Sequence, residues 1–226
     1  MLGYTAYGKG LWVDFGNLRG CVVTVPYKQV LVPLLDGVSP RAGALRSVNV
    51  IRREADGCLI GDNVDGDGFL NAARQHGFIG HGQRALVVGS GGVGSAIAYA
   101  LGEAGVSELT IADVSAERAE ALAAILRDAF PRLAVHTDFP SLAGFDLVVN
   151  ASPVGMGGSG ELPLPVAQLE TLRAGTLVAD VVTSPEITPL LDFAHRMGCP
   201  VQTGAEMAFA QLGNLGAFMG VTPQQI

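Results

Sequence analysis

ALVVGSGGVGSAIAYALG, residues 85–102, joins a short β-branched and apolar run to an apolar, helix-forming run through a cluster of glycines. The cluster has the spacing Gly89-x-Gly91-x-x-Gly94, directly after the predicted strand and at the start of the predicted helix. Glycine at these positions permits a tight turn, a close approach of backbone N–H groups to a pyrophosphate, and close packing of helix on strand. The stretch therefore predicts a dinucleotide-binding βαβ unit.

From Ala85 onward, short β-branched runs alternate with helical segments, a pattern typical of parallel strands joined by crossover helices. The runs are ALVVG, ELTIAD, LAVHT, DLVVNAS, TLVADVV and PVQTG. Between the second and the third, residues 115–130 place Ala119, Leu122, Ala123 and Leu126 on one face at helical spacing. The alternation predicts an α/β protein with a Rossmann-type, doubly wound parallel sheet.

The part of the chain before Gly82 has a different pattern of predicted elements. It contains three predicted strands, CVVTVP, RSVNVIRR and CLIGDN, and the last two are joined by a predicted hairpin turn at Asp56-Gly57. GFLNAARQHG then predicts a helix that leads into the second part. We therefore predict a smaller α/β substrate domain at residues 1–81, a dinucleotide-binding domain at 82–204, and a C-terminal helix at 205–226 that returns toward the substrate domain.

The composition excludes several classes of protein. The 226 residues include 14 Lys and Arg against 21 Asp and Glu, which gives a net charge of −7. Since no basic run could follow a phosphate backbone, nucleic acid is not an expected partner. The three cysteines and four histidines lack disulfide-framework or metal-ligand spacing, so no metal site is expected.

Two uncharged stretches, residues 85–102 and 207–226, are candidate membrane spans by length alone. Four glycines interrupt the first, and Gln211, Asn214 and Pro223 interrupt the second, so neither is expected to enter a membrane. The first ten residues lack the apolar region of a secretory signal. We therefore expect a cytoplasmic protein, either monomeric or homodimeric.

An acidic residue, Asp113, ends the second strand of the predicted parallel sheet, about 20 residues after the glycine cluster. A carboxylate at this position accepts hydrogen bonds from the adenosine ribose hydroxyls, whereas the 2′-phosphate of NADP would be repelled and calls for an arginine. Val114, Ser115 and Ala116 follow, and Arg118 is the nearest cation. The sequence predicts a preference for NAD, with NADP as the second candidate.

A second acidic segment, GDNVDGDG at residues 61–68, first suggests a calcium loop. Asn63, Asp65, Asp67 and Gly68 match four positions of an EF-hand. The twelfth position is Arg74 instead of the required glutamate, which excludes this interpretation.

Five segments resemble motifs of the shikimate dehydrogenase family, in the same order along the chain. VTVPYK resembles N-V-T-V-P-x-K, RSVNV resembles G-A-V-N-T, GDNVDGDGF resembles G-D-N-T-D-G-x-G, NASPVGM resembles N-A-T-P-x-G-M, and TGAEMAFAQ resembles D-G-x-x-M-L-x-x-Q. The resemblance covers nearly all of residues 20–220. It implies hydride transfer between a nicotinamide cofactor and the ring ketone or hydroxyl of 3-dehydroshikimate, shikimate, quinate or a related ring carboxylate.

The resemblance assigns the catalytic roles to Lys28 and Asp65. Reducing a ketone leaves an alkoxide that must gain a proton, and oxidising the alcohol requires that proton to be removed. Desolvation lowers the pKa of a lysine, whereas a neighbouring carboxylate raises it. Such a pair could therefore set the pKa of the lysine that transfers the proton. Outside these motifs, a surface lysine and a turn aspartate would be the simpler interpretation.

The resemblance also implies the residues that bind substrate and cofactor. The expected substrate contacts are polar side chains: Thr24, Asn49, Thr183 and Gln211. The expected cofactor contacts are the glycine cluster, the acidic residue and two backbone positions near the nicotinamide carboxamide: Gly89, Ser90, Gly91, Gly92, Val93, Gly94, Asp113, Val181 and Gly204. Hydrogen bonding within the scaffold is the alternative for Thr24, Asn49 and Gln211, and simple packing is the alternative for a cofactor contact by Met207.

The sequence departs from the family pattern in three places. Thr183 replaces a common tyrosine, and Val22 replaces the asparagine that begins the first motif. No Ser-x-Ser pair, which holds the substrate carboxylate in the family, precedes Gly20, so we expect an incomplete substrate domain. Either the chain starts late or it binds a different ligand.

Two functions therefore remain open. The first is a shikimate or quinate dehydrogenase, and the second is a catalytically weak NAD(P)-binding relative with a sensing or accessory role. Lys28 and Asp65 favour the enzyme, because a binding module needs no proton shuttle.

Overall fold

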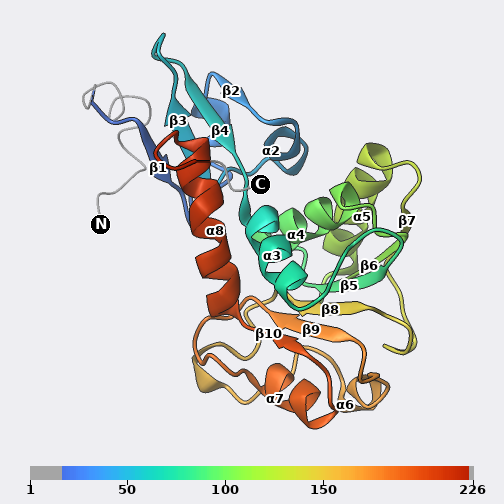
Figure 1. Ribbon diagram of the computed structural model, residues 1–226. Coiled ribbons are helices and arrows are strands. Elements are labelled where there is room, and N and C mark those ends of the chain that lie inside the picture. Colours follow the sequence, from blue (N-terminus) through green and yellow to red (C-terminus); the bar gives the residue numbers. More distant parts are fainter. Residues whose placement is uncertain (1–16, 224–226) are drawn as a thin grey trace. The chain divides into compact units, whose positions relative to one another are not determined.

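The computed structural model describes residues 17–223, which form two compact units (Figure 1). The first unit contains the described residues up to Asp65 and those from Leu212 onward, and the second is Gly66–Gln211. This division differs from the predicted boundaries at residues 81 and 204. The reason is local: a Cβ on Gly66 would lie 2.4 Å from the carbonyl oxygen of Ala96, so the helix that follows Asp65 packs within the second unit. The domain boundaries of 1–81, 82–204 and 205–226 stay a prediction.

The second unit contains a six-stranded parallel sheet in the order β10-β9-β8-β5-β6-β7. Its strands are β5 (Arg84–Val88), β6 (Glu108–Ala112), β7 (Ala134–His136), β8 (Leu147–Asn150), β9 (Leu177–Asp180) and β10 (Val201–Gln202). Each corresponds to one of the six predicted runs. The order proceeds outward from β5 in both directions, which is the order of the doubly wound dinucleotide-binding fold. The predicted fold class is confirmed.

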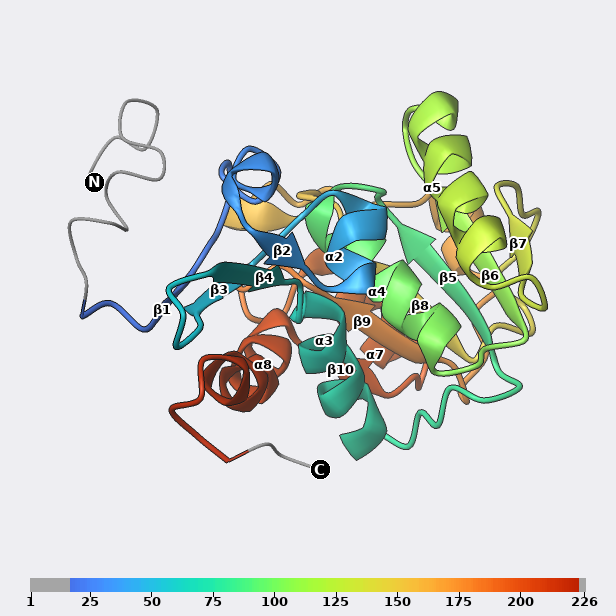
Figure 2. The same cartoon turned by 90° about the horizontal axis from the view of Figure 1, so that it is seen from above.

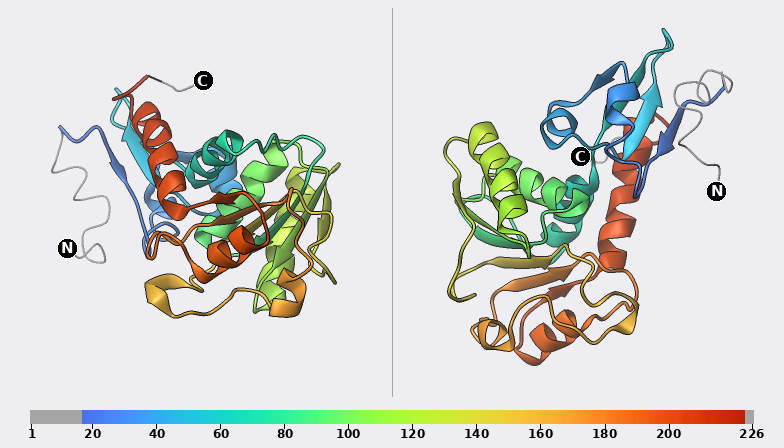
Figure 3. Two further views of the ribbon diagram at one scale, coloured as in Figure 1. Left: turned by 60° about the horizontal axis from the view of Figure 1, so that its bottom comes forward. Right: turned by 180° about the vertical axis from the view of Figure 1, so that it is seen from behind.

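Helices cover both faces of this sheet. They are α3 (Asp65–Gln75), α4 (Gly92–Glu103), α5 (Ala116–Ala129), α6 (Val166–Leu169), α7 (Pro189–Arg196) and the first part of α8 (Gly204–Phe218), with a 3-10 turn, η2 (Met156–Gly158). Figures 1 and 3 show α4 and α5 on one face and α6 and α7 on the other. In Figure 2, α4 and α5 lie side by side over the sheet, where they contact β5, β6 and β7.

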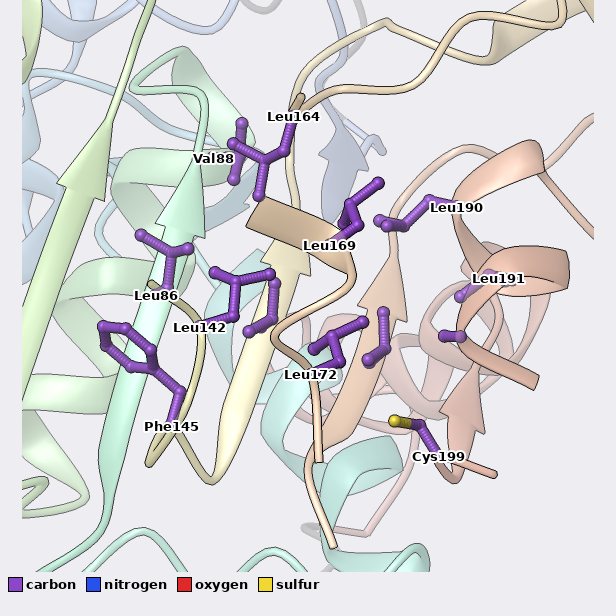
Figure 4. Packing of buried hydrophobic residues seen from close by; sticks show 13 residues of the cluster. Leu86, Val88, Leu142, Phe145, Leu164, Leu169, Leu172, Leu190, Leu191 and Cys199 are labelled. Atoms are coloured by element: carbon purple, nitrogen blue, oxygen red, sulfur yellow. The ribbon is translucent and has the colours of Figure 1, made fainter. Parts of the chain in front are cut away.

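Successive side chains of a strand point to opposite faces of the sheet, and those that face α6 and α7 enter a buried core (Figure 4). Leu86 and Val88 of β5 point into this core with Leu169 of α6 and Leu190 of α7. Full burial of one such side chain contributes roughly 1.5–3 kcal/mol. The neighbouring residues of β5 are also buried, so this sheet has apolar contacts on both faces, as parallel sheets require.

The first unit contains a four-stranded mixed sheet in the order β1-β3-β4-β2. Its elements are β1 (Gly20–Val22), η1 (Val32–Leu34), β2 (Gly37–Val38), α2 (Pro40–Leu45), β3 (Val50–Arg53) and β4 (Leu59–Asp62). β3 pairs antiparallel with both β1 and β4, whereas β2 is parallel to β4. The predicted hairpin turn joins β3 to β4, and Gly57 has φ 93° there.

The end of α8 completes the packing of the first unit. Leu215 lies in a buried cluster with Val50 of β3 and Val64. A second cluster on the same sheet includes Val48 and Ile51. Within residues 17–223, no helix combines the length and apolar character needed to cross a membrane.

Candidate active site

Lys28 and Asp65 lie together in the first unit, although 37 residues separate them in the chain. Lys28 Nζ donates a hydrogen bond to Asp65 Oδ2 at 2.5 Å, and the two side chains are 11% and 6% exposed. Removing either partner of a buried ion pair of this kind would leave the other charge buried and unpaired, which is costly. The pair that the family resemblance singled out is therefore brought together, while its catalytic role stays a prediction.

Asn49 fixes the second oxygen of Asp65. Its Nδ2 donates to Asp65 Oδ1 at 2.7 Å, and its Oδ1 accepts from the backbone N–H of Val64 at 2.9 Å. Asn49 is 2% exposed, and its own backbone N–H donates to the carbonyl of Asp62. Both ends of its amide are therefore used to hold the segment that carries the carboxylate. The predicted contact of Asn49 with substrate stays a prediction.

A partly buried cluster around Asp62 also anchors this segment. Arg41 donates two hydrogen bonds to its carboxylate, from Nε at 2.8 Å and Nη2 at 2.7 Å, and the Ser39 hydroxyl also donates to it. Burial raises the pKa of Asp62, but the hydrogen bonds from Arg41 and Ser39 outweigh burial, so the pKa lies below its ordinary value. The backbone N–H of Asn63 donates to Asp62 as well, at 2.7 Å. Sequence reasoning missed this cluster, for which the only local signal was Ser39 before Pro40 as a helix cap.

The glycine cluster forms the turn between β5 and α4 in the second unit. Gly89 has φ 99°, and a Cβ on Gly94 would lie 1.9 Å from the carbonyl oxygen of Gly89. A Cβ on Gly91 would meet no protein atom within 4 Å. Gly89 and Gly94 are thus required by the fold, whereas a side chain at Gly91 would enter open space in front of the loop. Ser90, Gly92 and Val93 belong to the same turn and helix start, as predicted.

A pocket of about 560 Å³ opens beside this loop, at the carboxyl ends of β5, β6 and β8. Its lining includes Gly89, Gly91, Asp113, Ser152 and Val154. Ligands bind at this edge in doubly wound sheets, where the strand order reverses. Three of the predicted cofactor contacts, Gly89, Gly91 and Asp113, line this pocket, while their role in binding stays a prediction. The rim at residues 152–154 comes from the NASPVGM motif, whose individual residues the sequence did not single out.

Asp113 accepts four hydrogen bonds at the end of β6. The backbone N–H and the hydroxyl of Ser90 reach Oδ2 at 2.8 and 2.7 Å, and Ser115 N and Arg118 Nη2 reach Oδ1 at 2.9 and 2.7 Å. Burial raises the pKa of Asp113, but these hydrogen bonds together hold it well below its ordinary range. The carboxylate is therefore ionised at neutral pH. Arg118 is the cation among the pocket-lining residues of the described chain.

The two predicted backbone contacts, Val181 and Gly204, lie against each other in the second unit. A Cβ on Gly204 would lie 2.4 Å from the carbonyl oxygen of Val182 and 2.7 Å from that of Val181. Glycine at the start of α8 is therefore needed for close packing on the end of β9. Met207, one turn later, is buried at 7% exposure.

The four predicted substrate contacts are distributed over both units. Thr24 is exposed and belongs to the first unit with Asn49, whereas Thr183 is exposed and belongs to the second unit with Gln211. Their contacts with substrate stay predictions. Among residues 17–223, no group of three or more His, Cys, Asp or Glu side chains is arranged to hold a metal ion.

Substitutions of Gly94 and Gly91 by alanine are expected to have different effects. Gly94→Ala forces the loop to move, because its Cβ would overlap the carbonyl oxygen of Gly89, and should destabilise the fold by about 1–3 kcal/mol. Gly91→Ala should change stability by less than about 0.5 kcal/mol, since its Cβ enters open space. It should nevertheless weaken dinucleotide binding about tenfold or more, because the methyl group occupies the approach to the backbone.

Thermal unfolding and NADH titration of the two variants provide the measurement. A Gly91→Ala protein that binds NADH as tightly as the wild type would show that the dinucleotide does not approach this loop.

Comparisons with known proteins agree with this geometry. A family model described as the shikimate dehydrogenase substrate binding domain matches residues 12–51. The chain is 40% identical over 202 residues to a shikimate dehydrogenase (NADP(+)) of Moorella thermoacetica, covering 86% of this chain and 67% of that protein. It is 37% identical to a quinate/shikimate dehydrogenase (NAD(+)) of Corynebacterium glutamicum, covering 97% of this chain and 77% of that protein.

Solved structures include the quinate dehydrogenase from Corynebacterium glutamicum in complex with NAD. It superposes with a TM-score of 0.83 at 35% identity, over 96% of this chain and 80% of that one. Relatives of this identity and coverage confirm what the five ordered motifs implied. The chain belongs to the shikimate dehydrogenase family.

Proposed function

We propose that this protein is a nicotinamide-dependent dehydrogenase that interconverts a ring hydroxyl and a ring ketone, with shikimate and 3-dehydroshikimate, or quinate, as the substrate class. The observation that carries the proposal is the buried Lys28–Asp65 pair, whose Nζ and Oδ2 are 2.5 Å apart. The pair occurs in a chain whose second unit has the fold and the pocket of a dinucleotide-binding protein.

The pocket fits a nicotinamide dinucleotide. The open space at Gly91 lets a pyrophosphate approach the backbone at the N-terminus of α4, and Asp113 offers a carboxylate to the adenosine ribose. Ser90 and Gly92 would lie along the pyrophosphate, and the close-packed backbone at Val181 and Gly204 would meet the carboxamide. When bound, the nicotinamide accepts a hydride from the alcohol carbon or supplies one to the ketone carbon.

Lys28 transfers the proton in this reaction. When the ketone is reduced, the Lys28 ammonium donates a proton from Nζ to the oxygen as the carbon gains the hydride, and in the reverse direction the amine left by that transfer takes the hydroxyl proton as the C–H hydrogen leaves with its electron pair. Asp65 orients Nζ through Oδ2, while Asn49 holds Oδ1. A positioned general acid or base of this kind contributes about 10²–10⁴-fold to the rate. Thr24, Asn49, Thr183 and Gln211 supply the polar contacts that a polyhydroxylated ring requires.

The cofactor preference is proposed to be NAD over NADP. The ionised Asp113 would repel a 2′-phosphate, and Arg118, the cation at the pocket, is already hydrogen-bonded to that carboxylate at 2.7 Å. Val114, the next residue, is fully exposed and offers no charge. The curated relatives include both an NADP(+) and an NAD(+) enzyme, so the preference rests on these residues of the pocket.

The proposal is tested by following reduced cofactor at 340 nm with shikimate and with quinate, each with NAD and with NADP. At least one acid should be oxidised, and NAD should give the higher kcat/KM. Titration with NADH in the absence of substrate serves as the control for cofactor binding. Binding of NADH without turnover of either acid would instead support a catalytically weak relative that acts through cofactor binding.

A further inference from the structure

A buried hydrogen-bond network joins the ends of two neighbouring strands in the second unit. β8 and β9 are parallel, and their register places Asn150 directly beside Asp180. Asn150 is 0% exposed and Asp180 is 2% exposed. Asn150 Nδ2 lies 3.1 and 3.2 Å from the two oxygens of the Asp180 carboxylate and donates to them.

The Asn150 side chain holds the loop that follows β8. Its Nδ2 also donates to the carbonyl of Val154 at 3.0 Å, and its Oδ1 accepts from the backbone N–H and the hydroxyl of Ser152 at 3.1 and 2.6 Å. Ser152 and Val154 line the dinucleotide pocket. The Asn150 amide therefore holds the backbone of residues 152–154, which form one rim of the pocket.

The Asp180 carboxylate holds the segment that follows β9. Oδ1 accepts from the backbone N–H of Val182 at 3.0 Å, and Oδ2 accepts from the Thr188 hydroxyl at 2.7 Å. The carbonyl of Val182 is the group against which Gly204 packs. The Asp180 carboxylate is thus connected to two backbone segments: the loop after β8, through Asn150, and the segment after β9, through Val182.

The chemistry of the pair explains why a carboxylate stands at this position. Every group that donates to Asp180 in residues 17–223 is uncharged, and burial raises its pKa, so the ionised form is costly here. A carboxylate can only accept hydrogen bonds, however, so it faces the NH₂ end of Asn150 in the same orientation that the Val154 carbonyl and the Ser152 N–H require. An uncharged amide at position 180 would put an NH₂ group, which cannot accept, in place of one carboxylate oxygen, so at least one of the donors Asn150, Val182 and Thr188 would lose its acceptor.

We infer that Asp180 is a positioning residue for the dinucleotide: as the acceptor for its NH₂ group it holds the Asn150 amide in place, and the amide in turn holds the Ser152–Val154 rim of the pocket. The inference rests on the proposed function, since it assumes that the pocket binds a nicotinamide dinucleotide. It differs from a purely structural role in its expected readout, which is cofactor affinity and not stability alone.

The test compares Asp180→Asn with Thr176→Val. Thr176 lies at 2% exposure beside the start of β9, and its hydroxyl donates to the carbonyl of Phe145 at 2.8 Å, far along the strand from the pocket rim. Each variant changes one buried polar side chain in the same region of the sheet.

By NADH fluorescence titration, Asp180→Asn should raise the Kd about tenfold or more, because small displacements of a binding segment are costly. The Kd of Thr176→Val should stay within about twofold of the wild-type value. In the turnover assay, Asp180→Asn should raise the KM for NAD by a similar factor and leave the KM for the acid within about twofold.

Two results would overturn the inference. One is a folded Asp180→Asn protein that binds NADH like the wild type, and the other is an equal loss of affinity in Thr176→Val. If Asp180→Asn does not fold, Thr188→Val replaces it, because that variant removes one donor to Asp180 and retains the carboxylate. It should raise the Kd more than twofold, and an unchanged Kd would reject the inference. Wild-type protein that does not bind NADH would instead reject the proposed function.

Discussion

Lys28→Met is expected to lower kcat for the oxidation of shikimate or quinate by about 10²–10⁴-fold, while the Kd for NADH stays within about twofold. Methionine retains most of the apolar stem of lysine but has no group that can accept or return a proton. The dinucleotide pocket belongs to the second unit, so its lining is not altered by a change at Lys28. Steady-state kinetics and NADH titration on the same preparation provide the measurement.

Loss of stability must be separated from loss of chemistry in this variant. Removing one partner of a buried ion pair costs about 3–5 kcal/mol, because the Asp65 carboxylate remains buried without its cation. The double variant Lys28→Met/Asp65→Asn removes that charge and should recover part of the stability without recovering activity. Gln29→Met, at the exposed neighbouring position, serves as the control and should retain wild-type kcat. Wild-type turnover by Lys28→Met would reject the proton-transfer role of this lysine.

Asp113→Asn/Val114→Arg is expected to reverse the cofactor preference, changing the ratio of kcat/KM for NAD to that for NADP by roughly 10²-fold or more. The first change removes the carboxylate that we propose repels a 2′-phosphate, and the second places a guanidinium at a fully exposed position on the lining of the pocket. Hydrogen bonds to charged groups contribute about 1.5–3 kcal/mol each, which is about tenfold or more for one contact. Kinetics with both cofactors at saturating acid measure the ratio.

The single variant Asp113→Asn and a control that removes the same charge elsewhere show which change causes this reversal. Asp113→Asn alone should relax the preference without reversing it, since no new cation is supplied. Glu117→Gln removes one negative charge from the first turn of α5, at an exposed residue outside the pocket lining, and should change the ratio less than about twofold. A wild-type protein that already uses NADP more efficiently than NAD would contradict the proposed role of Asp113.

The parallel sheet could be predicted from the sequence because its strands are buried on both faces and therefore appear as continuous β-branched runs. The elements of the first unit were harder to predict. β2 has two residues and α2 has six, too few for a periodic pattern to emerge. The start of α3 was also missed: the glycines at positions 66 and 68 are typical of a loop, yet both lie inside the helix. Position 66 is occupied by glycine because a side chain there would collide with Ala96.

The site could be predicted only as far as its residues lie in recognisable motifs. Lys28 and Asp65 were identified by family resemblance, because a separation of 37 residues says nothing about distance in space. Their contact depends on the β3–β4 hairpin and on the Asn49 amide. The Asn150–Asp180 network could not be predicted at all, since it requires the register of two strands that are 30 residues apart in the chain.

Hydride transfer from the ring carbon is tested most directly with shikimate that carries deuterium at C3. The protein is incubated with this substrate and NAD, and the reduced cofactor is analysed by mass spectrometry. Each molecule of ketone formed should be accompanied by one molecule of NADH that contains one deuterium. Ketone formed with unlabelled NADH, or with the deuterium released to water, would contradict direct hydride transfer by this protein.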